Sequence, residues 1–157
     1  MTGHRPPDSR SALTAHLPRP DRDSAPWWEL LAGRRFAVQE CDFCGMLRFP
    51  PRAFCAACRA EGAHWREVPP EGTVESWIVS RQPFVLGRRD RPIPSGNGRL
   101  AAVPGGLIYG NWRAERQPVP REPVAGVFAE VTPEVTLLGW APAGDADGSG
   151  AGIPGRT

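Results

Sequence analysis

The residues of this chain with the clearest chemical potential are its four cysteines, which all lie in one short stretch. They form two C-x2-C pairs, Cys41 with Cys44 and Cys55 with Cys58, and ten residues separate the pairs. Each pair can wrap two thiolates and the intervening backbone N–H groups around one metal ion, and two pairs complete a tetrahedral site of four sulfurs. Four thiolates leave no open coordination position, so we expect a structural metal site.

Other uses of the four cysteines stay open at this point. Two disulfides would use the same residues, but the chain shows no secretory signal that would place it in an oxidising compartment. A redox-active C-x-x-C requires a thioredoxin-like βαβ setting, which the pattern lacks. Rubredoxin-type sites hold iron with the same ligands, so zinc is favoured over iron although the ligand set does not select it. His64 is a possible extra ligand, but the site is already full, and a surface or packing role is simpler.

The segments around the cysteines predict how they are presented. Gly45 suits the tight turn after the first pair, whereas Arg59 occupies that place after the second, so we expect two knuckles that are not identical. The ten residues between the pairs, GMLRFPPRAF, predict a hairpin with Pro50 and Pro51 at its bend.

A search for catalytic groups returns little. The three histidines are His4, His16 and His64, and no Ser-His-Asp or Cys-His pair can be placed among them. Glu130 and Glu134 flank a predicted turn and are most simply solvated. We therefore do not expect an enzyme with chemistry of its own.

The basic residues are all arginine, 19 in number, and the net charge is only +2. Such a balance gives no global field that demands nucleic acid or an acidic membrane. Several arginines gather between residues 81 and 99 and could bind phosphate groups or an acidic patch on a partner, although a solvated charged loop is the plain alternative. These candidate ligand-binding residues are Arg81, Arg88, Arg89, Arg91 and Arg99.

A short helix is predicted over residues 24–33, with Ser24 as its N-cap and Gly33 at its end. Trp27 and Trp28 can share an apolar face with Leu31. Ten residues cannot hold a helix alone in water, so this face should dock on the core or on another protein. Trp27 and Trp28 are therefore the candidate partner-binding residues.

The remaining elements read as short strands: residues 34–40 leading into the cysteines, then 73–80, 106–112, 124–131 and 134–141. Along 73–80, Val74 and Ile78 are expected on one face and Trp77 and Val79 on the other. Because the connections between these strands are rich in Gly and Pro, the pattern predicts a mainly β protein with a small barrel or sandwich.

The ends of the chain differ from its middle. Residues 1–23 and the Gly-rich stretch 143–157 read as a disordered arm and tail, and almost all Leu, Ile, Val and Phe residues lie between them. No apolar run is long enough to span a membrane, so we expect a soluble, cytoplasmic protein with one compact domain.

These residues together resemble the DUF35 family. The segment PWWELLAGRRFAVQECDFCGMLRFPPRAFCAACRAEGAHWREVPPEGTVESWIVSR is similar to the family's start: an aromatic helix, a strand, a rubredoxin-like zinc ribbon, a Trp and a Gly-Thr-Val entry into an OB-fold barrel. VFAEVTPEVTLLGWAPA resembles its closing strands. The resemblance implies the divisions 24–33 helix, 34–70 zinc ribbon and 71–142 OB-fold.

The resemblance also implies a role. Its members are associated with thiolases, thiolase-like aldolases or MaoC-type hydratases, as non-catalytic subunits that bind acyl-CoA or hold the enzyme in its assembly. This chain departs from the pattern in residues 81–105, where only Leu100–Val103 offers a short apolar strand, so the barrel is expected to be incomplete. The alternative is a nucleic-acid-binding zinc-ribbon and OB protein, which the balanced charge disfavours.

Overall fold

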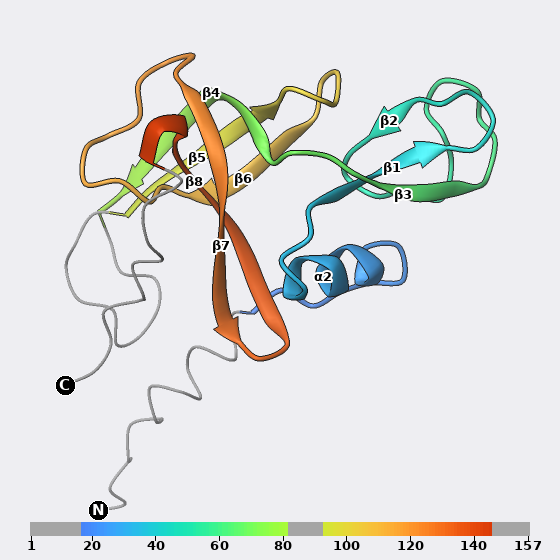
Figure 1. Cartoon of the computed structure of the whole chain (residues 1–157), viewed down its shortest axis with the longest axis horizontal. Helices are drawn as coiled ribbons and strands as arrows, with labels where there is room; N and C mark the ends of the chain where they lie inside the picture. The colour runs from blue at the N-terminus through green and yellow to red at the C-terminus, as the bar shows by residue number, and fades with distance from the viewer. Residues whose placement is uncertain (1–16, 82–92, 146–157) are drawn as a thin grey trace, which may run out of the picture.

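The computed structural model describes residues 17–81 and 93–145. Among these residues, no helix is long and apolar enough to cross a membrane. The elements, in chain order, are α2 (Ala25–Ala32), β1 (Ala37–Cys41), β2 (Leu47–Arg48), β3 (Ala63–Glu67), β4 (Glu71–Ser80), β5 (Ile93–Leu100), β6 (Leu107–Asn111), β7 (Pro123–Thr132), β8 (Val135–Pro142) and η1 (Ala143–Asp145). The fold is mainly β with one short α-helix in the described part, as predicted (Figure 1).

The first sheet carries the cysteines and has the order β2-β1-β3, all antiparallel. It forms a separate lobe at one side of the molecule (Figure 1). The predicted hairpin between the cysteine pairs is wrong, because β2 pairs back with β1 through Gln39 and Arg48. Farther on, Phe54 makes an isolated antiparallel bridge with Glu61. The segment between the pairs is thus joined to the sheet through β2, and its other end pairs with Glu61, which precedes β3.

The second sheet has the order β6-β5-β4-β7-β8, with antiparallel neighbours throughout. Its two edge strands approach each other at one parallel bridge between Trp112 and Trp140, where the Arg113 N–H donates to the Trp140 carbonyl at 2.8 Å. This arrangement is that of an OB barrel whose last seam is a single bridge rather than a full ladder. The expectation of an incompletely closed barrel agrees with this seam.

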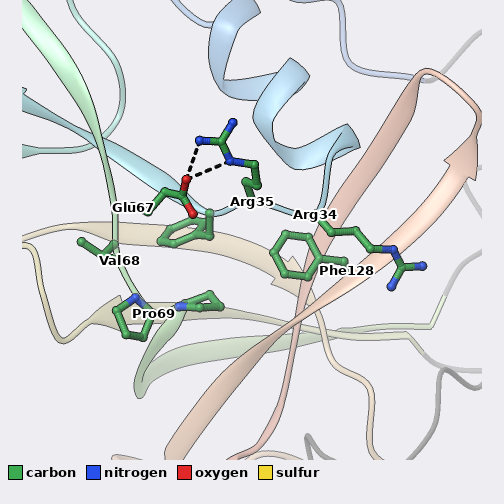
Figure 2. Close-up of a pocket in the computed structure, with 8 residues that line it drawn as sticks. Arg34, Arg35, Glu67, Val68, Pro69 and Phe128 are labelled. Atoms are coloured by element: carbon green, nitrogen blue, oxygen red, sulfur yellow. Dashed lines mark hydrogen bonds and ion pairs between the residues drawn. The ribbon is translucent and has the colours of Figure 1, made fainter.

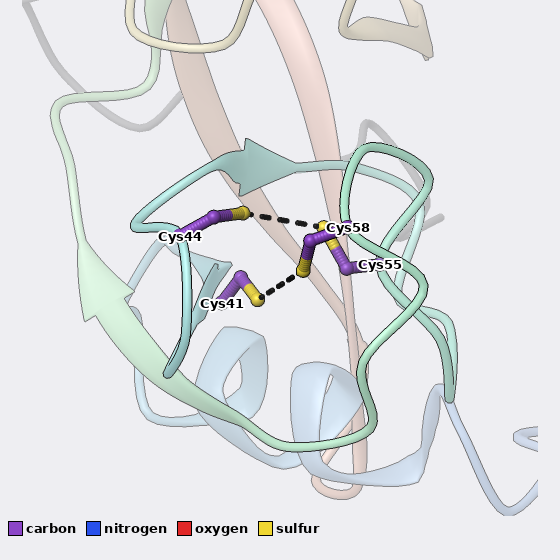
Figure 3. Close-up of side chains that lie close together, drawn as sticks. All are labelled: Cys41, Cys44, Cys55 and Cys58. Atoms are coloured by element: carbon purple, nitrogen blue, oxygen red, sulfur yellow. Dashed lines mark hydrogen bonds between the residues drawn. The ribbon is translucent and has the colours of Figure 1, made fainter.

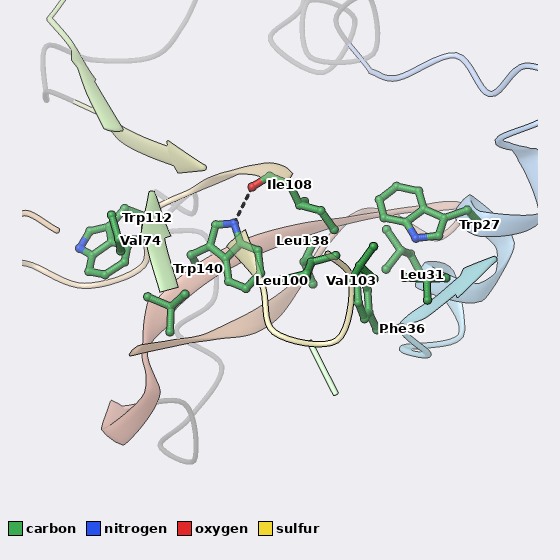
Figure 4. Packing of buried hydrophobic residues seen from close by; sticks show 12 residues of the cluster. Trp27, Leu31, Phe36, Val74, Leu100, Val103, Ile108, Trp112, Leu138 and Trp140 are labelled. Atoms are coloured by element: carbon green, nitrogen blue, oxygen red, sulfur yellow. Dashed lines mark hydrogen bonds between the residues drawn. The ribbon is translucent and has the colours of Figure 1, made fainter. Parts of the chain in front are cut away.

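Within residues 81–105, only Leu100–Val103 was expected to be extended. This prediction is wrong, because strand β5 begins earlier, at Ile93. β5 ends at Leu100, and its sequence IPSGNGRL has glycine at alternating positions. Gly98 lies against the indole of Trp140, whose ring occupies the barrel interior and donates from Nε1 to the Ile108 carbonyl at 2.9 Å (Figure 4). Gly98 therefore occupies an inward position that an apolar side chain usually fills, because Trp140 already fills that space.

Strand β4 also departs from the predicted alternation. Its register with β5 shifts between Val74 and Ser76, which marks a β-bulge. A bulge of one residue exchanges the two faces of a strand beyond it. Val74 is consequently buried and Trp77 packs against the core, whereas Ile78 is 60% exposed. The predicted pairing of Val74 with Ile78 on one face is wrong for this reason.

Helix α2 joins the two sheets into one hydrophobic core. It packs against β8, and Trp27 and Leu31 are buried together with Phe36 and Val103 (Figure 4). The helix ends where predicted, with Ser24 at its N-cap and Gly33 at its C-cap, although the capping interactions differ from those expected. The side chain of Ser24 makes no capping hydrogen bond, and Gly33 has an ordinary backbone (φ −79), while the residue after it takes the left-handed conformation.

Candidate metal centre

The four cysteine sulfurs meet at one point of the ribbon lobe (Figure 3). All four Sγ atoms lie within 4.8 Å of one another, and all four thiols are free. Two of the contacts, Cys41 to Cys58 and Cys44 to Cys55, measure 3.6 Å. A tetrahedral ion with metal–sulfur bonds of about 2.3 Å places its sulfurs roughly 3.8 Å apart. The arrangement therefore fits a four-coordinate metal ion.

Both knuckles have the same backbone geometry although their sequences differ. The Gly45 N–H donates to the Cys41 carbonyl at 2.9 Å, and the Arg59 N–H donates to the Cys55 carbonyl at 3.0 Å. Gly45 (φ 69) and Arg59 (φ 63) both adopt the left-handed conformation. The expectation of non-identical knuckles is thus wrong for the backbone, because the turn forces the same conformation on arginine as on glycine at a cost of about 1 kcal/mol.

The knuckles also stabilise thiolate at the first cysteine of each pair. Hydrogen bonds from the Cys58 and Ala57 backbone lower the pKa of Cys55 to about 6. The pKa of Cys41 is lowered in the same way by the backbone of Cys44 and Phe43. Negative sulfur is the form that binds a metal, so the folded knuckles prepare two ligands before any ion arrives.

The second cysteine of the first pair behaves differently. The Met46 backbone hydrogen bond lowers the pKa of Cys44, but the nearby thiols of Cys58 and Cys55 outweigh it and raise that pKa to about 12. Several thiolates this close repel one another, and either protonation or a bound cation relieves the repulsion. The charge distribution therefore favours a bound metal ion.

A buried arginine forms hydrogen bonds that hold the loop leading to the second cysteine pair. Arg48 is 8% exposed, and its Nε donates to the Gln39 side-chain oxygen at 2.8 Å, while its Nη2 donates to the Arg52 carbonyl at 3.1 Å. The same Gln39 oxygen accepts the Arg52 N–H at 2.9 Å. The sequence did not predict this hydrogen-bond network, because neither Arg48 nor Gln39 belongs to a motif.

His64 lies outside the sulfur cluster. Its Nδ1 is 2.8 Å from the Asp42 carboxylate and its Nε2 is 3.6 Å from Glu40, and the ring is 60% exposed. Among the described residues, the group that can hold a metal consists of the four cysteines alone. This placement fits a surface role for His64.

The structure does not place the other candidate residues at the metal centre. Arg88, Arg89 and Arg91 lie outside the described residues. Arg99 is held by the Glu75 carboxylate through two hydrogen bonds of 2.8 and 2.7 Å, and Arg81 is exposed at the end of β4. The charge of the Arg99 guanidinium is therefore already paired with a carboxylate.

The two helix tryptophans differ in exposure. Trp27 is 7% exposed and packs against Trp28 and Phe49, with ring centroids 4.8 and 5.3 Å apart. Trp28 is half-buried, so part of its ring reaches the surface. A role in binding a partner stays a prediction, and it rests mainly on Trp28.

Comparisons with known proteins agree with this architecture. Residues 28–62 match the family model described as ChsH2, rubredoxin-like zinc ribbon domain. A solved chain of the "Ltp2-ChsH2(DUF35) aldolase" is 29% identical with a TM-score of 0.72, and the match covers 81% of this chain and 99% of that one. A DUF35 protein of unknown function from Sulfolobus solfataricus shares the fold, with 13% identity, a TM-score of 0.54 and coverage of 77% and 85%.

One curated relative also matches in part. The "Probable enoyl-CoA hydratase alpha subunit" of Thermomonospora curvata is 38% identical over 68 residues, which are 42% of this chain and 21% of that subunit. The match thus spans about a fifth of the relative's length. A rubredoxin-like ribbon of four cysteines joined to an OB sheet defines a two-part architecture. The chain thus has a zinc ribbon similar to that of the ChsH2 family model and the fold of the solved DUF35 proteins.

Proposed function

We propose that this chain is a non-catalytic subunit of an enzyme that acts on CoA thioesters, such as a thiolase-like aldolase or a MaoC-type hydratase. The observation that carries the proposal is the match over nearly the whole length of the chain solved in the Ltp2-ChsH2(DUF35) aldolase. The partial match to a hydratase subunit points to the same class of substrate. The proposal places the chemistry in the partner enzyme.

Two features of the described residues support a non-catalytic role. The four thiolates would fill the coordination sphere of a metal ion and leave no position for substrate or water. In the barrel, the space beside Gly98, Trp112 and Trp140 is too narrow for a water molecule. Neither interior offers a substrate-sized cavity, so the chain would act through its surface.

Zinc is the metal that we propose for the ribbon. The ligand set and its geometry suit iron equally well, and the zinc-ribbon family model is what favours zinc. Elemental analysis of untagged protein distinguishes the two, since a four-thiolate iron site is also coloured. One zinc per chain supports the proposal, and stoichiometric iron contradicts it.

Acyl-CoA binding is the finer part of the proposal. We expect the isolated chain to bind acyl-CoA weakly or not at all, because Arg99 is engaged by Glu75 and the interiors are filled. Titration calorimetry with acetyl-CoA and a long-chain acyl-CoA, on the isolated chain and on the complex, measures both states. Tight binding by the isolated chain would contradict the expectation.

The subunit role is tested by co-expressing the chain with the thiolase-like or hydratase genes that neighbour its own gene. We expect one such enzyme to co-elute with it at fixed stoichiometry and to lose turnover of its CoA thioester without it. The isolated chain should show no turnover under the same conditions. An enzyme that is fully active alone and never co-elutes would refute the proposal.

A further inference from the structure

The β7–β8 hairpin extends beyond the rest of its sheet, past helix α2 (Figure 1). β7 pairs with β4 only from Pro123 to Ala125, whereas its pairing with β8 continues to Thr132. Within the described part of the chain, no strand pairs with the other edge of β7 beyond Ala125. The distal half of β7 is therefore an open strand edge.

The direction of the backbone groups along this edge follows from one hydrogen bond. The Gly126 N–H donates to the Pro70 carbonyl, on the side away from β8, at 2.6 Å. Backbone groups alternate along a strand, so Phe128 and Glu130 also direct their N–H and C=O groups away from β8. Val127 and Ala129 direct theirs toward β8, with which they pair. Two residues thus offer donors and acceptors to an incoming strand.

A groove of about 360 Å³ runs beside this edge (Figure 2). Phe128 lines it from β7, and the opposite walls come from the turn after α2 and from the link between β3 and β4. Those walls consist of Arg34, Arg35, Phe36, Glu67, Val68, Pro69 and Pro70. The groove therefore combines an apolar floor with a charged rim.

The two arginines of the rim are in different states. Arg35 donates to the Glu67 carboxylate, with Nε 2.8 Å from Oε1. Arg34 extends alongside Phe128, away from that ion pair, and has no ion pair or side-chain hydrogen bond with any described residue (Figure 2). An unpaired guanidinium beside an open strand edge suits a carboxylate of an added strand.

We propose that an extended segment of the partner enzyme adds to the open edge of β7 as a further strand and places a carboxylate on Arg34. Main-chain hydrogen bonds to Phe128 and Glu130 would supply the docking, and the groove would take an apolar side chain of the segment. Open edges that no device protects favour pairing with another chain. The identity of the partner rests on the proposed function; the edge and the groove do not.

Hydrogen exchange of the β7 amides in the complex tests the proposal with an internal control. We expect the Phe128 and Glu130 amides to exchange rapidly in the isolated chain and at least tenfold more slowly in the complex with the co-eluting enzyme. The Val127 and Ala129 amides, bonded to β8, should be protected in both states. Unchanged exchange at Phe128 and Glu130 in a complex that does form would overturn the proposal.

Charge reversal at Arg34 supplies the second measurement. Arg34 has φ 56, a conformation that Asp and Asn tolerate well, so Arg34→Asp and Arg34→Asn should keep the fold. Arg121→Asp is the matched control, because Arg121 is also exposed and has φ 62. We expect Arg34→Asp to weaken the complex at least tenfold, Arg34→Asn less, and Arg121→Asp less than twofold, with equal melting temperatures. Equal loss in the two Asp variants would overturn the assignment of Arg34.

Other occupants of the edge give distinct results. If the Phe128 and Glu130 amides are already protected in a monomeric isolated chain, the chain's own residues cover the edge. If their protection disappears when a dimer is diluted, a second copy of the chain covers the edge. Either result overturns the proposal. If no enzyme associates, the proposed function fails by itself. The edge is then tested with a short capped peptide of alternating Val and Thr with one Asp: selective protection of Phe128 and Glu130 keeps the strand-addition site, and no protection overturns it.

Discussion

Replacing Gly98 by alanine tests whether Trp140 fills the interior of the barrel. A methyl carbon at this position would overlap Cε2 and Cζ2 of the indole and lie 2.9 Å from its Cδ2. The ring is 1% exposed and hydrogen-bonded to the Ile108 carbonyl, so it cannot move aside without losing that bond. The substitution should therefore strain the barrel rather than fill a void.

The expected cost follows from three contributions. Overpacking costs about 1–3 kcal/mol, and loss of the indole hydrogen bond adds about 1 kcal/mol. Relief of glycine's backbone entropy in a strand offsets roughly 0.5–1 kcal/mol. We expect a net loss of about 1–3.5 kcal/mol, which lowers the melting temperature of a chain of this size by roughly 2–14 °C. Gly96→Ala is the control, because its methyl carbon would lie 3.3 Å from the Ser76 carbonyl oxygen, and it should cost less than about 1 kcal/mol.

Urea unfolding followed by circular dichroism, at equal metal content, measures both variants. Combining Gly98→Ala with Trp140→Leu should recover at least about 1 kcal/mol relative to the sum of the single changes, since the smaller side chain removes the overlap. Wild-type stability in Gly98→Ala, or strict additivity in the double variant, would refute the account of the barrel interior.

Four further outcomes are expected. Cys41→Ser should lose the bound metal and unfold the ribbon, as measured by elemental analysis and near-ultraviolet circular dichroism, because metal binding and folding are coupled; full retention of the metal would contradict this. Arg59→Gly should stabilise the chain by about 0.5–1 kcal/mol and Gly45→Ala should destabilise it by about 1 kcal/mol, since both positions are left-handed; the opposite signs in thermal unfolding would disprove the shared geometry. Glu122→Gln should lower the free energy of unfolding by about 1 kcal/mol at neutral pH, because a hydrogen bond from Arg116 lowers the pKa of Glu122 below 4.5. This stability is present above pH 4.5 and is lost as the pH falls through the lowered pKa. The acid unfolding curves of the wild type and the variant should therefore converge at low pH. Because Trp28 also packs against Trp27, Trp28→Ala should lower the melting temperature slightly, but it should weaken association with the partner enzyme while the metal content stays unchanged; a lower melting temperature without loss of the partner would assign Trp28 to the core alone.

The metal centre could be predicted from the sequence because its chemistry is local. The spacing within each cysteine pair is enough to form one knuckle, and the two knuckles then meet through a short intervening segment. What the spacing does not reveal is that Arg59 adopts the same left-handed backbone as Gly45. A propensity argument assigns that conformation to glycine, whereas the turn around the cysteines imposes it on whichever residue stands there.

The barrel was harder to predict because its inward positions depend on a distant residue. A search for strands by alternating apolar residues assigns Gly96 and Gly98 to a loop. They alternate in fact with Ser95 and Asn97, and this period-two pattern of glycine is a signal for a strand that passes a large side chain. Only the fold shows that Trp140 supplies that side chain. The bulge in β4 is likewise invisible in a single sequence.

The groove beside β7 had no signal in the sequence, since its walls come from three separate segments. Its position has a consequence for function. The four thiolates enclose one interior of the molecule and Trp140 fills the other, so substitutions at those places should act on stability. Changes at Arg34 and at the Phe128 edge should act on association instead, because they alter a surface and leave the cores intact. Variants that separate these two effects would locate the function of this chain on its surface, where the proposed non-catalytic subunit would act.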